Sequence, residues 1–113
     1  MIYRIEYSED AKKDRDALDN SAKMQVEKVM RRVAQNPFPK NEGGYGEPLG
    51  HKQGMNLTGL CKIKLKRLGI RVVYRVVRDE DVMRVIVVAA RADSEVYEIA
   101  SRRISQTEGK PLL

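Results

Sequence analysis

The chain is predicted to fold as one α+β domain, with a small antiparallel sheet of about four strands and three helices. Two observations support this class: short segments alternate apolar and polar residues, and others repeat apolar residues at helical spacing. The length of 113 residues is typical of one domain with a modest core. The predicted order is β-α-α-β-β-β-α, with the two N-terminal helices packed on one face of the sheet.

The N-terminal third is predicted to hold one strand and two helices. Residues 2–7 alternate apolar and polar side chains, as a half-buried strand does. Ser8 can cap a short charged helix that runs to about Leu18. A second cap near Asp19 starts a longer helix, which Pro37 brings to an end. The apolar stripe of this second helix is formed by Ala22, Val26, Val29, Met30 and Val33.

The middle of the chain is predicted to be a long loop followed by three strands. Residues 37–59 hold most of the glycines and prolines, which favours a loop, and long loops are often functional. Strands are expected over about 60–66, 70–78 and 82–90, with tight turns between them.

The C-terminal part is predicted to be one helix and a loose tail. The helix is expected to start near Asp93 and to end near Ile104. Residues 105–113 show no periodicity, so the domain is expected to cover residues 1–104.

Composition limits the class of function. The net charge of +6 favours association with nucleic acid, although an acidic protein partner would satisfy the same charge. One cysteine and one histidine are too few for a Cys/His metal site, and the sequence has no glycine-rich phosphate loop. Without a signal peptide or an apolar run of about 20 residues, a cytoplasmic protein is the simplest reading.

The most informative segment is the predicted strand over residues 61–66, where apolar and cationic residues alternate. Cys61 and its alternate neighbours would face a core, and the lysines would share the other face. No Asp or Glu occurs between residues 60 and 77. Such a face repels itself unless it binds an anion, although a merely solvated strand face is the simpler alternative. The cations assigned to this face are Lys62, Lys64, Lys66, Arg71, Arg75 and Arg91.

Residues 62–65, 69–76 and 91–97 together resemble the RelE toxins of bacterial toxin–antitoxin systems. The most specific part is the coincidence of two lysines, two arginines and one tyrosine at matching places. The Gly-x-Arg-x-x-Tyr element is weaker evidence, because gyrase-poisoning relatives of the ParE type share it. The resemblance runs from the first strand to about Ile104 and implies a RelE-like fold.

The resemblance implies a ribosome-dependent endoribonuclease that cuts messenger RNA in the A site, with no metal or other cofactor. A ribose 2′-hydroxyl would attack the adjacent phosphate. Lys64 would act as general base and Arg91 would assist the leaving 5′-oxygen. Lys62 and Arg71 would stabilise the transition-state charge, and Tyr97 would orient or stack on the nucleotide. Lys64 needs a lowered pKa for this role, which we attribute to the surrounding cations.

The resemblance also implies partners: the ribosome with its messenger RNA, and a cognate antitoxin whose acidic or amphipathic segment covers the basic face. Two alternatives stay open, a ParE-like gyrase inhibitor and an inactive relative that binds only antitoxin or RNA. His51 has no visible catalytic partner, so an RNA-contacting or solvated role is favoured for it. The cations expected to contact ribosomal RNA are Lys52, Lys66, Arg67, Arg75 and Arg78.

Overall fold

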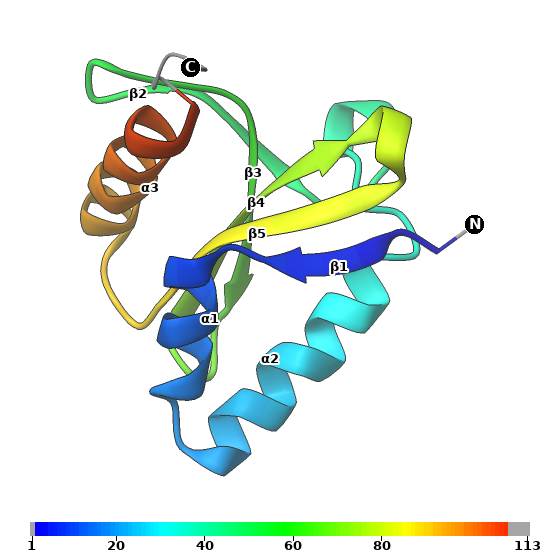
Figure 1. Ribbon diagram of the computed structural model, residues 1–113, viewed down its shortest axis with the longest axis vertical. Coiled ribbons are helices and arrows are strands. Elements are labelled where there is room, and N and C mark those ends of the chain that lie inside the picture. Colours follow the sequence, from blue (N-terminus) through cyan, green and yellow to red (C-terminus); the bar gives the residue numbers. More distant parts are fainter. Residues whose placement is uncertain (1, 109–113) are drawn as a thin grey trace.

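The computed structural model describes residues 2–108 and contains a five-stranded sheet in the order β1-β5-β4-β3-β2 (Figure 1). Strand β1 runs parallel to β5, and every other neighbouring pair is antiparallel. The α+β class is therefore confirmed, but the sheet has one more strand than predicted and is mixed. The strands are β1 (Arg4–Tyr7), β2 (Glu47–Lys52), β3 (Met55–Leu65), β4 (Ile70–Val77) and β5 (Val82–Ala89).

Three α-helices and two short 3-10 helices, η1 (Lys40–Glu42) and η2 (Arg78–Glu80), complete the fold. The α-helices are α1 (Glu9–Asp16), α2 (Asn20–Val33) and α3 (Asp93–Glu108). The predicted caps are confirmed: the Ser8 hydroxyl accepts from the backbone N–H of Ala11 at 3.1 Å, and the Asp19 carboxylate accepts from that of Ala22 at 2.8 Å. Each satisfies one of the free N–H groups of a helix start.

The long loop predicted over residues 37–59 is wrong, because it contains β2 and the start of β3. Several of the glycines and prolines that suggested a loop belong to the β2–β3 hairpin, whose pairing is irregular. Its pairing shifts register between Pro48 and Gly50, and Gly50 has a φ of +58°. Its two turn residues, Gln53 and Gly54, both have positive φ, which is typical of a tight hairpin turn.

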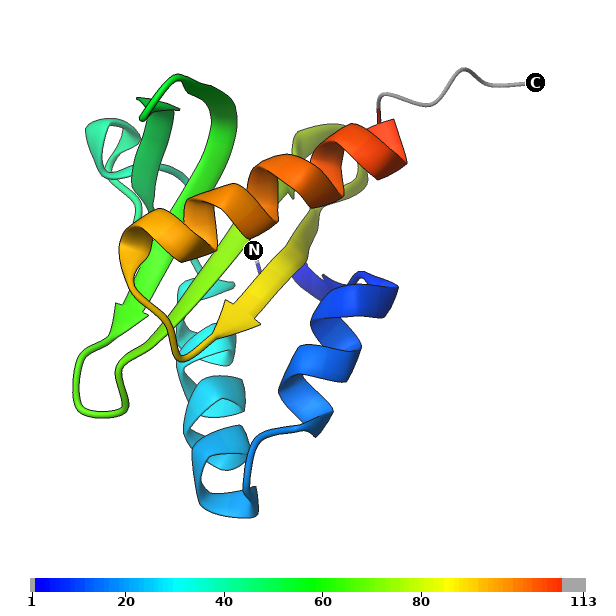
Figure 2. The same cartoon turned by 90° about the vertical axis from the view of Figure 1, so that its left-hand side faces the viewer.

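The helices cover both faces of the sheet, with α1 and α2 on one side and α3 across the other (Figure 2). Cys61 and Leu65 pack with the residues of α1 and α2 in one apolar cluster, which confirms the predicted parity of β3. Leu60 packs with Val96 and Tyr97 of α3 in a second cluster. After Gly59, which has a φ of +90°, the even-numbered residues of β3 therefore face α3, whereas before it the odd-numbered Leu57 packs in this second cluster.

The C-terminal helix is longer than predicted. Helix α3 continues to Glu108, so the loose tail expected over 105–113 is wrong for residues 105–108, and residues 109–113 lie outside the described part of the chain. Residues 105–108 are polar, and they lack the apolar repeat from which a helix is predicted. Within residues 2–108 no helix is both long and apolar enough to cross a membrane.

Candidate functional site

The candidate site lies where β3, β4 and the start of α3 meet. Lys64 on β3 stands directly opposite Arg71 on β4, so these two cations share one face of the sheet. Lys62 lies two residues earlier on the same face, opposite Glu47 of β2. Arg71 is in register with the last residue of β5, after which the chain turns through Arg91 into α3. The fold therefore gathers residues that are far apart in sequence, such as Lys62 and Tyr97, which are separated by 35 positions.

Lys62 is buried, with 7% of its surface exposed, and three oxygens surround its ammonium group. The Nζ atom lies 3.0 Å from the Tyr97 hydroxyl, 3.0 Å from Glu47 Oε2 and 3.2 Å from Asp93 Oδ1. Burial disfavours the charged form of this lysine, but the hydrogen bonds with Tyr97, Glu47 and Asp93 outweigh it and raise its pKa above the ordinary value. Lys62 is therefore a fixed positive charge at neutral pH.

Arg71 is held by the beginning of α3. Its Nε donates to Asp93 Oδ1 at 2.6 Å, and its Nη1 donates to the carbonyl oxygens of Gly69 and Arg91. Burial favours the neutral form of Asp93, but hydrogen bonds from Arg71 and Lys62 outweigh it and hold the pKa of this carboxyl below its usual range. Asp93 is thus a carboxylate that bridges two of the predicted site cations.

The expectation that no acid neutralises these cations is wrong for Lys62 and Arg71. No acid lies in their own stretch of sequence, but β2 supplies Glu47 and α3 supplies Asp93. Sequence reasoning missed Glu47 because it fell in the predicted loop. From sequence, Asp93 and Glu95 are both possible partners of Arg91. In the structure Glu95 pairs with it at 3.2 Å, while Asp93 bridges Lys62 and Arg71.

The other site residues differ in exposure. Lys64 is exposed, and within residues 2–108 it is without a carboxylate partner. Arg91 is also exposed, and its pair with Glu95 is solvated on both sides. Tyr97, by contrast, is only 5% exposed, because its ring packs in the apolar cluster under α3. The hydroxyl of Tyr97 takes part in the ionic cluster, whereas its ring is covered.

A groove of about 580 Å³ passes the site at the free edge of β3. Pairing between β2 and β3 ends at Glu47 and Lys62, so the following residues of β3 pair with β4 on one side and have no strand on the other. Most of the charged lining of this groove is cationic. The charged residues that line it are Arg32, Lys40, Glu47, Lys62, Lys64, Lys66 and Asp93.

Comparison with known proteins identifies the family. Residues 5–95 match the family model described as the ParE toxin of the type II toxin–antitoxin system parDE. The chain belongs to the RelE/ParE toxin family. It is 32% identical to a RelE-like toxin protein of Escherichia coli and 32% identical to the mRNA interferase toxin RelE of Escherichia coli K12, in each case over 92% of this chain and 99% of the relative.

Solved structures agree with this assignment of a RelE-like toxin of a type II toxin–antitoxin system. The free E. coli toxin RelE, in a mutant form, superposes with a TM-score of 0.72 at 32% identity, over 92% of this chain and 99% of that one. The same toxin bound to a peptide of the antitoxin RelB gives 0.66 at 25% identity, with both chains fully covered. The RelE-like fold predicted from sequence is therefore confirmed.

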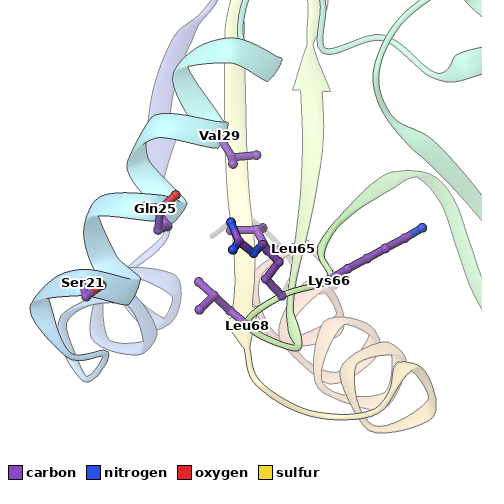
Figure 3. A pocket seen from close by; sticks show the side chains of 7 residues that line it. Ser21, Gln25, Val29, Leu65, Lys66 and Leu68 are labelled. Atoms are coloured by element: carbon purple, nitrogen blue, oxygen red, sulfur yellow. The ribbon is translucent and has the colours of Figure 1, made fainter.

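The outer cations of this RelE-like toxin do not form one surface. Of the five predicted to contact RNA, only Lys66 lines the groove described above. Lys66 and Arg67 lie in the turn after β3, beside a second hollow of about 480 Å³ between that turn and α2, and Figure 3 shows Lys66 pointing away from the helix. Lys66 was predicted as part of the strand, whereas β3 ends one residue before it.

The other three outer cations are spread over the molecule. Lys52 is the last residue of β2, at the tip of the hairpin. Arg75 shares the face of Arg71, as predicted, but lines a hollow at the other end of α3. Arg78 pairs with Glu42 at 2.8 Å. His51 lies in β2, exposed and outside the groove lining.

Proposed function

We propose that this RelE-like toxin is an endoribonuclease that cuts messenger RNA in the ribosomal A site, without a metal ion. The observation that carries the proposal is the pair of Lys64 and Arg71, two cations directly opposite each other on neighbouring strands. Like charges in this position destabilise a sheet. Arg91 adds a third cation at the same end of the sheet, and a phosphate group between these side chains would relieve their repulsion.

The proposed reaction begins with proton transfer from a ribose 2′-hydroxyl to the neutral amine of Lys64. The 2′-oxygen forms a bond to the adjacent phosphorus, and the bond from phosphorus to the 5′-oxygen breaks. The 5′-oxygen takes up a proton from water, with Arg91 stabilising its developing charge, and Lys64 returns its proton to the solvent. The products are a 2′,3′-cyclic phosphate and a 5′-hydroxyl, so atoms and charge balance without an oxidant or a metal.

Arg71 and Lys62 are proposed to stabilise the charge on the phosphoryl oxygens. Arg71 is fixed by three hydrogen bonds, so it is already oriented before substrate binds. Lys62 is a buried permanent cation on the same face of the sheet. Tyr97 is proposed to orient the site through its hydroxyl, which contacts Lys62. The naming of a relative as an mRNA interferase supports the ribonuclease function.

A cognate antitoxin is proposed as the protein partner. Solved structures of RelE with the antitoxin RelB or a peptide of it support such a partner for this chain. An acidic or amphipathic antitoxin segment would find its complement in the cationic groove at the free edge of β3. Occupation of this groove would exclude RNA from Lys64.

The experiment that tests the proposal is cleavage of a message on ribosomes that hold a defined codon in the A site, with the 5′ ends mapped. Free RNA of the same sequence is the comparison, and EDTA tests metal independence. We expect cuts within the A-site codon that persist in EDTA and disappear in Arg91→Ala. An intact message with wild-type toxin would contradict the proposal.

Inhibition of DNA gyrase is the second candidate, because the matching family model is that of ParE. Supercoiling of relaxed plasmid by gyrase, measured with and without the toxin, separates the two functions. Loss of supercoiling together with an intact message would favour the gyrase inhibitor. The retained cations Lys62, Lys64 and Arg91 and the retained Tyr97 favour the ribonuclease.

A further inference from the structure

The hydrogen-bond donors of Lys62 are fully occupied. A lysine ammonium has three N–H donors, and here three oxygens lie within 3.2 Å of Nζ, those of Tyr97, Glu47 and Asp93. The group is also almost entirely buried. A phosphate oxygen can accept a hydrogen bond from Lys62 only if one of these three acceptors leaves.

Most donors of Arg71 are occupied as well. Its Nε faces Asp93, and its Nη1 faces the carbonyl oxygens of Gly69 and Arg91. The two carbonyls hold the guanidinium in place without neutralising it. Asp93 is therefore the only anion at Arg71 among the described contacts, and it takes the Nε position that a phosphate oxygen would share in a two-point contact.

Asp93 differs from the other carboxylate of the cluster. A single oxygen of Asp93, Oδ1, lies 2.6 Å from Arg71 Nε and 3.2 Å from Lys62 Nζ, which is where a phosphoryl oxygen between two cations would lie. Glu47 contacts Lys62 alone and stands opposite it on the neighbouring strand. If Asp93 turned away, Glu47 and Tyr97 would still hold Lys62.

The side chain of Asp93 can leave without disrupting the core. It is 41% exposed, whereas the side chains of Lys62 and Arg71 are 8% and 15% exposed. Asp93 is the first residue of α3, so rotation about its side-chain bonds moves the carboxylate toward solvent while the helix backbone stays in place.

We propose that Asp93 is a specificity-determining residue, an internal anion that competes with RNA phosphate for Arg71 and Lys62. RNA that is free in solution must displace this carboxylate, so it binds weakly. RNA held beside the toxin in the A site has a high local concentration and displaces it. This inference rests on the proposed ribonuclease function and adds a reason why free RNA is a poor substrate.

The test compares Asp93→Asn with Glu98→Gln. Both variants remove one negative charge from α3, but Glu98 is exposed and makes no contact with the site cations. The probe is a short fluorescent oligonucleotide with 2′-deoxy sugars, which cannot be cut by 2′-hydroxyl attack. Its binding is measured by anisotropy at several salt concentrations.

We expect Asp93→Asn to bind the oligonucleotide about tenfold more tightly, since it removes a charge within a few ångströms of the phosphate. Its affinity should also fall more steeply with salt than that of the wild type. Glu98→Gln should bind within about twofold of the wild type. In parallel, Asp93→Asn should raise the rate of free RNA cleavage relative to cleavage on ribosomes.

Two results would overturn the inference. Equal tightening by Asp93→Asn and Glu98→Gln would show that only net charge matters. Weaker binding by Asp93→Asn would show that Asp93 orients Arg71 and does not compete with RNA. Thermal unfolding checks that each variant is folded, and Asp93→Ser, which keeps a residue suited to a helix start, replaces an unstable Asp93→Asn.

A different measurement shows whether the proposed ribonuclease function itself fails. It would appear as an intact message on ribosomes with wild-type toxin, whereas the inference about Asp93 is decided by the ratio of oligonucleotide affinities.

Discussion

Helix α3 is attached to the sheet by an arginine–aspartate cluster at each end, and the two clusters differ in charge balance. Near its C-terminal end, Arg103 donates to both oxygens of Asp14, at 2.7 and 3.1 Å, and to the carbonyl of Ile86. Asp14 also accepts from the backbone N–H of Val88. Arg103 has two carboxylate partners there, since Asp10 Oδ2 lies 3.8 Å from its Nε, and the bidentate geometry with Asp14 is that of a structural lock.

At the N-terminal end, Arg71 and Asp93 form a similar pair, but further cations stand around it. Lys62 is bound to the same carboxylate, and Lys64 is exposed on the sheet beside it. The chemistry of the contact is the same at both ends. The difference teaches that an excess of fixed cations, and not the presence of an ion pair, distinguishes the candidate site from the lock.

The largest expected effect is a loss of activity without a loss of stability, from a substitution in the candidate site. Lys64→Ala should lower the rate of message cleavage on ribosomes by at least about 100-fold, because it removes the proposed base. The free energy of unfolding should change by less than about 0.5 kcal/mol, since the side chain is exposed. Single-turnover cleavage and denaturant unfolding measure the two quantities.

The matched control for this variant is Lys28→Ala, an exposed lysine on α2 outside the groove. It should leave cleavage unchanged. Equal rates for Lys64→Ala and Lys28→Ala would remove Lys64 from the mechanism.

The second effect concerns the lock. Asp14→Ala removes the carboxylate that accepts from Arg103 and from the Val88 N–H, and should lower the free energy of unfolding by about 2 kcal/mol. Cleavage per folded molecule should stay that of the wild type. Asp16→Ala, on the same helix but in an exposed pair with Arg15, should cost at most about 0.5 kcal/mol. Loss of activity in folded Asp14→Ala would show that the two ends of α3 are not independent.

A smaller effect is the pH dependence of the site cluster. Because the folded-state pKa of Asp93 is lowered, its contribution to stability is present above the pKa of the unfolded chain and is lost as the pH falls through the folded value. The stability advantage of wild type over Asp93→Asn should therefore shrink on acidification below about pH 4. Urea unfolding at a series of pH values measures it, and an advantage that grows in acid would contradict the ion pairing described here.

The smallest effect belongs to a surface pair. Arg78 and Glu42 are both exposed, so Arg78→Ala should change the free energy of unfolding by no more than about 1 kcal/mol. If Arg78 contacts ribosomal RNA, the variant should also reduce the salt slope of ribosome binding by about one. An unchanged slope would remove Arg78 from the RNA interface.

Sequence reasoning succeeded where the signal was local. The alternation in β3 correctly divided Cys61 from Lys62, and the hydroxyl and carboxylate before α1 and α2 correctly predicted their starts. It failed where the signal depended on tertiary contacts. The parallel pairing of β1 with β5 joins residues that are 78 positions apart, and nothing near Arg4 indicates the direction of its partner.

For the candidate site, too, sequence reasoning found part of the residues and missed others. The five proposed residues are gathered at one end of the sheet, but the carboxylates of Glu47 and Asp93 among them were not foreseen. Glu47 reaches Lys62 only because a strand forms in a glycine-rich segment. A bulge and a hairpin turn use the same residues as a loop does, so composition alone could not separate them.

The pairing of β1 with β5 has a consequence for folding during synthesis. A strand made at the start of synthesis must wait for residues 82–85, its partner in the sheet, and Arg91 and Tyr97 follow later still. The β4–β5 hairpin is local and can form early, but the sheet closes late. A nascent chain that stops before Arg91 carries the cationic strands without the helix that completes the site. Most of the domain is thus synthesised before the proposed active site can form.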